Sequence, residues 1–193
     1  MEDCRTRMTR LRLDDCKKLS AIAIQNHDLL KYSPSEIHTK TKLKKYIRVA
    51  VGEFLKDTWY PYLIFDKETK KYAGCTSFGN YVVQHKRVEI GWTWLGREFQ
   101  GTGLNKHVKY LMLGYAFEKL NMNRVEFKID ERNVASRKAV EKIGGTLEGI
   151  LRKHTILSDG YIRNTCYYGI LNEEWPIIRN KIFKDIILQN EMK

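Results

Sequence analysis

Two glycines ahead of a predicted helix are the residues of this sequence best placed for chemistry. Gln100-Gly101-Thr102-Gly103 follows an apolar run. After it, apolar residues recur at helical spacing, namely Leu104, Val108, Leu111, Met112, Tyr115 and Ala116. A glycine turn at a helix N-terminus leaves amide N–H groups unpaired beside the positive end of the helix dipole. The pattern predicts a site for a phosphate or pyrophosphate; a tight strand-to-helix turn without a ligand is the plain alternative.

Two common nucleotide motifs are excluded at this turn. The dinucleotide fingerprint needs a third glycine, and Lys106 occupies that position. The sequence Gly-x-x-x-x-Gly-Lys-Ser/Thr does not occur, which argues against a P-loop nucleotidase.

The turn is positioned by the run that precedes it, residues 88–95. This run is rich in β-branched and aromatic residues, which favours a buried strand. Gly91 interrupts the run, and an isolated glycine within a strand indicates a bulge or a close approach of another backbone.

The rest of the chain alternates between strand-like and helix-like segments. Strands are predicted at residues 5–13, 60–65, 72–82, 88–95, 124–130, 146–157 and 161–171. Helices are predicted at residues 14–25, 38–55, 104–120, 134–143 and 172–189. Polar turns at residues 66–71 and 158–160 predict two hairpins. The order predicts one mixed sheet covered by helices, an α+β or α/β arrangement in a single domain spanning residues 1–193.

The composition describes a soluble globular protein with a basic surface. Hydrophobic residues make up 42% of the chain, charged residues 30%, and the formal net charge is +12. This excess favours anionic partners: a phosphorylated cofactor, an acidic protein surface or nucleic acid. No RNA motif or Arg-rich tract supports nucleic acid, and the basic cluster at residues 40–45 is typical of a solvated face.

The sequence contains no targeting segment, and its cysteines have no spacing typical of a metal or redox site. No apolar run has membrane-spanning length, and the first residues lack a signal-peptide pattern, so we expect a cytoplasmic protein without a membrane partner. The four cysteines have neither metal-ligand nor redox spacing, so we expect free thiols and no metal.

An ordered set of motifs resembles the GNAT N-acyltransferases. The signature Gln/Arg-x-x-Gly-x-Gly/Ala aligns with Gln100, Gly103 and Asn105. More narrowly, four segments resemble the RimJ/RimL-type branch, which includes ribosomal-protein N-terminal acetyltransferases: Glu89-Ile-Gly-Trp, Asn133-Val-Ala-Ser-Arg-Lys, Gly149-Ile-Leu-Arg-Lys-His and Glu173-Glu-Trp. The resemblance implies a mostly antiparallel twisted sheet whose two central strands splay apart, flanked by helices.

The resemblance also implies acetyl-CoA as acyl donor and a set of residues that would bind it. Main-chain groups of Thr93, Trp94 and Leu95 would pair with the pantetheine amides as an added strand would. A backbone N–H near Trp94 or Leu95 would stabilise the developing oxyanion. The loop that would surround the CoA pyrophosphate consists of Gln100, Gly101, Thr102, Gly103, Leu104 and Asn105.

Three further family positions fall at the start of the helix predicted at residues 134–143. Asn133 matches a residue that reaches the cofactor, although a plain helix cap is an equal alternative. Ser136 matches a position proposed to protonate the departing thiolate, against the alternative of a solvated serine. Lys138 matches a basic position that could approach the CoA phosphates, against an ordinary exposed lysine.

The sequence also offers candidates for the general base and departs from the family pattern at three positions. Glu89 is the candidate base, with an ion pair to a basic neighbour as the alternative; His154 is a second candidate. Asn105 replaces a small residue, Val140 stands where many relatives carry a tyrosine acid, and Gly145 replaces an aromatic residue.

The leading hypothesis is therefore direct acetyl transfer from acetyl-CoA to a primary amine, above all a protein N-terminal α-amine. A small-molecule acceptor, such as a polyamine, amino acid or drug, is the second hypothesis. Trp92, Trp94, Tyr167 and Tyr168 are candidates for the acceptor wall. A non-catalytic RNA- or ribosome-binding protein is the third hypothesis, and the state as monomer or homodimer stays open.

Overall fold

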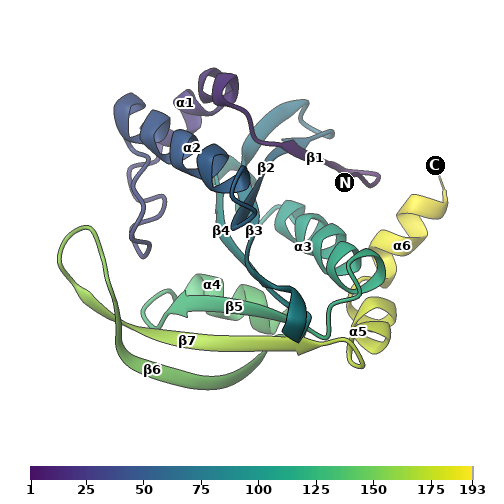
Figure 1. Ribbon diagram of the computed structural model, residues 1–193. Helices are drawn as coiled ribbons and strands as arrows, with labels where there is room; N and C mark the ends of the chain where they lie inside the picture. Colours follow the sequence, from purple (N-terminus) through teal and green to yellow (C-terminus); the bar gives the residue numbers. More distant parts are fainter. Residues whose placement is uncertain (193) are drawn as a thin grey trace.

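A computed structural model describes residues 1–192 as one seven-stranded sheet with helices on both faces (Figure 1). The strands are β1 (Thr6–Arg10), β2 (Trp59–Asp66), β3 (Lys71–Val82), β4 (Arg87–Leu95), β5 (Arg124–Asp130), β6 (Thr146–Ile156) and β7 (Ile162–Leu171). Their spatial order is β1-β2-β3-β4-β5-β7-β6, and every neighbouring pair is antiparallel except β4 and β5. The predicted mixed sheet is confirmed.

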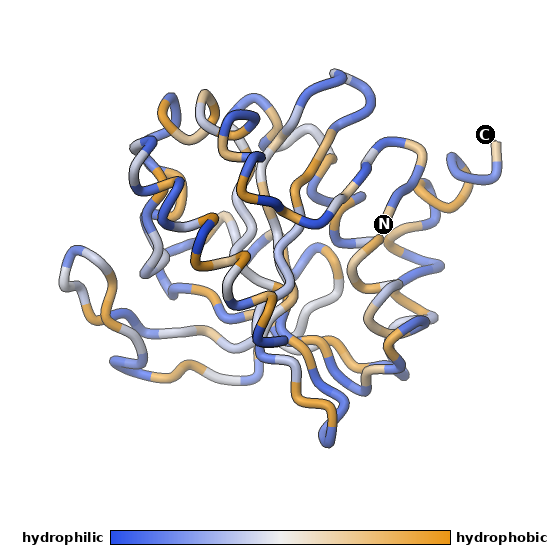
Figure 2. The backbone as a smooth tube through the Cα atoms, turned by 45° about the horizontal axis from the view of Figure 1, so that its top comes forward, coloured by the Kyte–Doolittle hydropathy of each residue, from blue (hydrophilic) through white to orange (hydrophobic). Residues whose placement is uncertain are grey.

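Helices cover the two faces of the sheet. The main helices are α1 (Cys16–Gln25), α2 (Lys40–Phe54), α3 (Leu104–Gly114), α4 (Val134–Glu141), α5 (Trp175–Ile182) and α6 (Lys184–Glu191). Figure 2 shows hydrophilic and hydrophobic residues alternating along the helices, as expected for helices with one buried face. No helix among residues 1–192 combines the length and apolar character that crossing a membrane requires.

Two hydrophobic cores lie on opposite faces of the sheet. One joins α1 and α2 to the strand residues Leu63, Cys75 and Trp94. The other joins α3, α4 and α5 to residues such as Val88 and Ile90 of β4. Side chains of successive strand residues point to opposite faces. Glu89 of β4 therefore faces the side of α1 and α2.

The central strands β4 and β5 separate along their length. They pair in parallel only where residues 87–89 meet residues 124–126, although β4 continues to Leu95 and β5 to Asp130. The predicted splay is thus confirmed, and we call the opening between residues 90–95 and 127–130 the fork.

A β-bulge in β4 lies at the fork. Ser77 of β3 pairs with Gly91 and Cys75 pairs with Trp94, so β4 has one residue more than β3 in this stretch. The bulge predicted at Gly91 is present, but the left-handed residue is Trp92, with φ of 50°. Such a φ costs a non-glycine residue of order 1–3 kcal/mol. Packing of the indole against Trp59, at 5.1 Å between ring centroids, compensates part of this cost.

Three predicted segments end differently in the structure. The first strand ends at Arg10, because residues 13–15 form a short 3₁₀ helix. The helix predicted at residues 104–120 changes from α to π geometry at Tyr115. The single helix predicted at residues 172–189 is wrong: it divides into α5 and α6 at Phe183, whose side chain is fully buried and packs on Trp175.

Close contact between β3 and β4 requires glycine at position 74. A Cβ there would overlap the Trp94 carbonyl oxygen, and φ is 151°. We expect Gly74→Ala to lower the free energy of unfolding by about 2 kcal/mol or more, because the strands must move apart. Urea unfolding measures the change.

Gly149→Ala on β6 is the matched control, because a Cβ there meets nothing within 4 Å. Equal stability of the two variants would contradict the close approach of β3 and β4.

Candidate functional site

One side of the β4 main chain faces the fork along residues 90–95, where no strand within residues 1–192 pairs with it. Gly96 N–H donates to the Ala73 carbonyl at 2.9 Å, so Gly96 faces β3. Hydrogen-bonding direction alternates along a strand. The groups of Trp94 therefore face β3, and those of Thr93 and Leu95 face the fork.

The Leu95 carbonyl confirms this direction, since it accepts a hydrogen bond from Gln100 Nε2 at 2.8 Å. Of the three main-chain positions predicted to bind the cofactor, Thr93 and Leu95 are thus presented to the fork. The Trp94 side chain is buried in the core under α1 and α2.

The predicted phosphate loop keeps an open surface ahead of α3. Gly101 and Gly103 have φ of 75° and 90°. A Cβ on Gly101 would meet nothing within 4 Å, and one on Gly103 would meet only Arg5 Nη1 at 3.5 Å. Among residues 1–192, the amide N–H groups of Gly101, Thr102, Gly103 and Asn105 have no acceptor. The loop therefore offers free donors and room for an anion, which fits a diphosphate.

Arg5, near the N-terminus, contacts this loop and holds it in place. Its guanidinium donates to the Thr102 carbonyl at 2.7 Å and to Thr102 Oγ1 at 3.3 Å. The same guanidinium pairs with Asp66 and Glu68. No local sequence signal indicates a contact across so much of the chain, so sequence reasoning missed Arg5.

Asn105 is the second residue of α3, and it is half-buried. Its Oδ1 atom is buried and accepts from no residue within 1–192. A buried amide oxygen without a donor is costly, so an N–H or O–H donor of a bound ligand would stabilise it.

Glu89 marks the closed end of the fork on the side of α1 and α2. It is 6% exposed, and its Oε2 accepts from Asn80 Nδ2 at 2.6 Å and from Lys128 Nζ at 2.8 Å. Lys128 Nζ also lies over the Tyr167 ring, 5.4 Å from its centroid. The ion pair that the sequence left as an alternative is therefore present, and it holds the Glu89 side chain at the fork.

Aromatic side chains extend from Glu89 along the same face. Trp92 and Tyr167 are half-buried there, and the exposed His154 packs edge-on against Tyr167 at 5.6 Å. Trp94 and Tyr168, the other two candidates for an acceptor wall, are buried in the two cores.

The three site residues predicted at the start of α4 lie in three different environments. Asn133 caps the helix, since its Oδ1 accepts from Ser136 N–H at 3.1 Å. Ser136 is half-buried and Lys138 is exposed. Val140 is buried, and a Cβ on Gly145 would overlap its Cγ1 atom, so these two departures from the family pattern occupy the same space.

A buried lysine lies under the β4 bulge on the opposite face of the sheet from Glu89. Lys109 of α3 is 5% exposed, and its Nζ donates to Thr93 Oγ1 at 2.8 Å. Burial lowers its pKa from 10.5 to about 7. Sequence reasoning missed this lysine, because its only signal is one charge among the inward positions of a helix.

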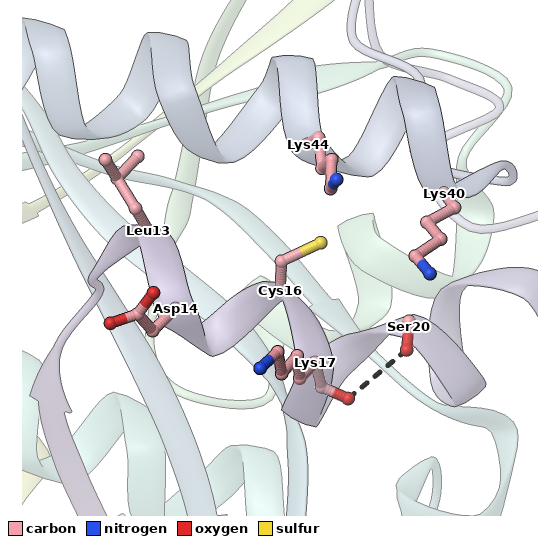
Figure 3. Close-up of a pocket in the computed structure, with 7 residues that line it drawn as sticks. All are labelled: Leu13, Asp14, Cys16, Lys17, Ser20, Lys40 and Lys44. Atoms are coloured by element: carbon pink, nitrogen blue, oxygen red, sulfur yellow. Dashed lines mark hydrogen bonds between the residues drawn. The ribbon is translucent and has the colours of Figure 1, made fainter.

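A cluster of potential metal ligands and a surface pocket lie outside the fork. Asp3, Cys4 and His107 bring three ligand atoms within 4.8 Å of one another, with Asp3 Oδ2 at 2.8 Å from His107 Nδ1. A surface pocket of about 380 Å³ between α1 and α2 is lined by Lys17, Lys40 and Lys44, among other residues (Figure 3). None of the predicted site residues lines this pocket.

Comparisons with known proteins agree with this geometry. Residues 5–146 match the acetyltransferase (GNAT) domain family. The chain is 26% identical over 148 residues to the "Uncharacterized N-acetyltransferase YnaD" of Bacillus subtilis strain 168, covering 77% of this chain and 83% of that protein. It is 33% identical over 103 residues to the "Putative ribosomal N-acetyltransferase YdaF" of the same strain, covering 53% of this chain and 55% of YdaF.

A solved structure supports the same fold over nearly the whole chain. The crystal structure of a putative acetyltransferase from T. thermophilus superimposes with a TM-score of 0.84 and 31% identity, covering 96% of each chain.

The lowered pKa of Lys109 makes a prediction for stability. Between pH 7 and 10.5 the unfolded chain keeps the proton that the folded chain has lost. Stability therefore rises with pH in this window, by up to about 1.4 kcal/mol per pH unit from this group. We expect the wild type to gain stability over Lys109→Met as pH rises, measured by urea unfolding.

Lys119→Met is the control, because Lys119 is exposed. It should keep the wild-type dependence on pH. Parallel curves for the wild type and Lys109→Met would show that Lys109 titrates as an ordinary lysine.

Proposed function

Because the chain belongs to the GNAT acetyltransferase family and is an acyltransferase, we propose that it transfers an acetyl group from acetyl-CoA to a protein N-terminal α-amine. The observation that supports this most directly is the fork: within residues 1–192, no strand pairs with residues 90–95 on that side, and amides of the glycine loop at its end have no acceptor.

The residues at the fork suit acetyl-CoA, which would supply an acetyl thioester as the acyl donor. The main chain of Thr93 and the N–H of Leu95 would hold the pantetheine arm as an added strand. The loop from Gly101 to Asn105 would hold the pyrophosphate, and Lys138 the other phosphates. A fork-facing N–H would stabilise negative charge on the thioester oxygen. Asn133 would contribute through its Nδ2, because its Oδ1 caps α4.

Glu89 is the residue we propose to take the proton of the acceptor amine, through a water molecule. An α-amine with a pKa near 8 costs about 1.4 kcal/mol to deprotonate at pH 7, and a lysine near 10.4 costs about 4.6 kcal/mol. One carboxylate acting as general base is enough to deprotonate the α-amine, but it is not enough to deprotonate the lysine side chain. Lys128 and Asn80 hold the carboxylate at the fork, which positions it.

A protein acceptor is also supported by the similarity to YdaF, whose name describes a putative ribosomal N-acetyltransferase. The half-buried Trp92 and Tyr167 would flank the first residue of an incoming peptide. Ser136 on α4, which is half-buried, is one candidate to supply a proton to the leaving thiolate.

An amine screen tests the proposed function. We expect thiol release from acetyl-CoA with peptides that carry a free N-terminus, and at least 10-fold less with lysine side chains or polyamines. Glu89→Gln should lower the rate with peptides by about 10-fold or more. Peptides with an acetylated N-terminus are the negative control, because they have no free α-amine. Turnover with polyamines alone would favour a small-molecule enzyme, and no turnover with any amine would reject the proposal.

The glycine loop makes a separate prediction for binding. We expect Gly103→Val to weaken CoA binding by about 10-fold or more, because its side chain would enter the space ahead of α3. Isothermal titration measures the affinity. Gly160→Val is the matched control: its φ of 83° imposes the same backbone strain, but it lies in the turn between β6 and β7. Equal affinities would count against the loop.

A further inference from the structure

Lys109 has no counter-ion in the part of the chain that the structure describes. Its hydrogen-bond partner is the Thr93 hydroxyl, at 2.8 Å from Nζ. No carboxylate of residues 1–192 lies within 4.0 Å of Nζ. A buried ammonium without an acid is costly to a protein. Neither helix formation nor core packing requires a lysine at this position.

The hydroxyl that Lys109 touches belongs to a residue of the fork. Thr93 directs its main chain into the fork and its side chain toward α3, where Thr76 Oγ1 lies 2.8 Å away. Thr76 in turn donates to Met112 Sδ at 3.3 Å. The titratable group of this cluster is Lys109. The other polar groups around it are the Thr76 hydroxyl, the Met112 thioether and the Gly91 carbonyl, which accepts from Thr93 Oγ1 at 3.4 Å.

We infer that Lys109 and Thr93 form a proton relay that neutralises the sulfur leaving group of the acyl donor. One proton passes from Thr93 Oγ1 to the sulfur, and one from Lys109 Nζ restores the hydroxyl. Lys109 ends as a neutral amine and recovers a proton from solvent. Lys109 acts through Thr93 and is a positioning residue, whereas Thr93 would touch the donor. The inference rests on the proposed function.

The acid strength of the buried lysine suits this role. A thiol has a reference pKa of about 8.5. An ordinary lysine, near 10.4, is too weak an acid to protonate a thiolate favourably. Burial lowers the pKa of Lys109 to about 7, which makes the transfer favourable. The relay also supplies an acid in a chain where Val140 stands at the position of the family's tyrosine.

Single-turnover rates across pH test the relay. The wild type should lose rate on the alkaline side of its pH optimum, because the relay needs a protonated Lys109. Lys109→Met and Thr93→Val should lack this alkaline limb and react about 10-fold more slowly at pH 7. Thr93→Ser should restore both rate and limb. Lys119→Met, on the same helical segment but exposed, should match the wild type. Unchanged pH profiles in Lys109→Met would overturn the relay and reduce Lys109 to a packing role.

A binding measurement gives a readout that does not depend on turnover. At about pH 6, where Lys109 keeps its proton, the wild type should bind CoA several-fold more tightly than desulfo-CoA, which lacks the thiol. Lys109→Met should bind the two compounds equally. A preference that persists in Lys109→Met would also overturn the relay. If the wild type turns over no amine at all, the proposed function fails; if it turns over but either Lys109 test fails, only the relay fails.

Discussion

The separation of β4 from β5 after Glu89 is the constraint on which the rest of the structure depends. Buried main-chain N–H and C=O groups require partners. Two adjacent strands of a sheet normally satisfy each other, and here residues 90–95 lack a neighbour on one side. The bulge at Trp92 turns β4 away from β5, and Gly74 allows β3 to follow it closely. A segment of open strand edge in the middle of a sheet is stable only because the remaining strands and two cores hold it.

This constraint divides the residues around the fork into two sets. Alternation along β4 sends Glu89 to the face of α1 and α2, and Thr93 to the face of α3. On the first face, Glu89 meets Lys128 and Asn80. On the second face, Thr93 meets Lys109. The single extra residue of the bulge sets this difference, because without it Thr93 would point to the same face as Glu89.

Local patterns predicted the elements and the loop, and missed the side chains that reach them from afar. The strands and the glycine turn depend on short stretches of sequence, so residues 88–95 and Gly101 to Gly103 were recognisable. The division at Phe183 depends on burial of one side chain against Trp175, which no local pattern contains. Arg5 on Thr102 and Lys128 on Glu89 are contacts between segments distant in the chain. Such contacts follow only from the order of the strands in the sheet, and hydrophobic periodicity does not specify that order.

The departures from the family pattern are explained by packing rather than by loss of the site. Val140 fills the space that a side chain on Gly145 would need, so the two changes compensate each other. Val140 itself is buried in the core that also contains Ile143 and Ile178. With the family's tyrosine acid absent, a proton donor must reach the fork from another element. The buried face of α3 carries Lys109, which donates a hydrogen bond to Thr93. The loop and first turn at the start of α3 present the amides that have no acceptor within residues 1–192, and the second turn of α3 presents the lysine.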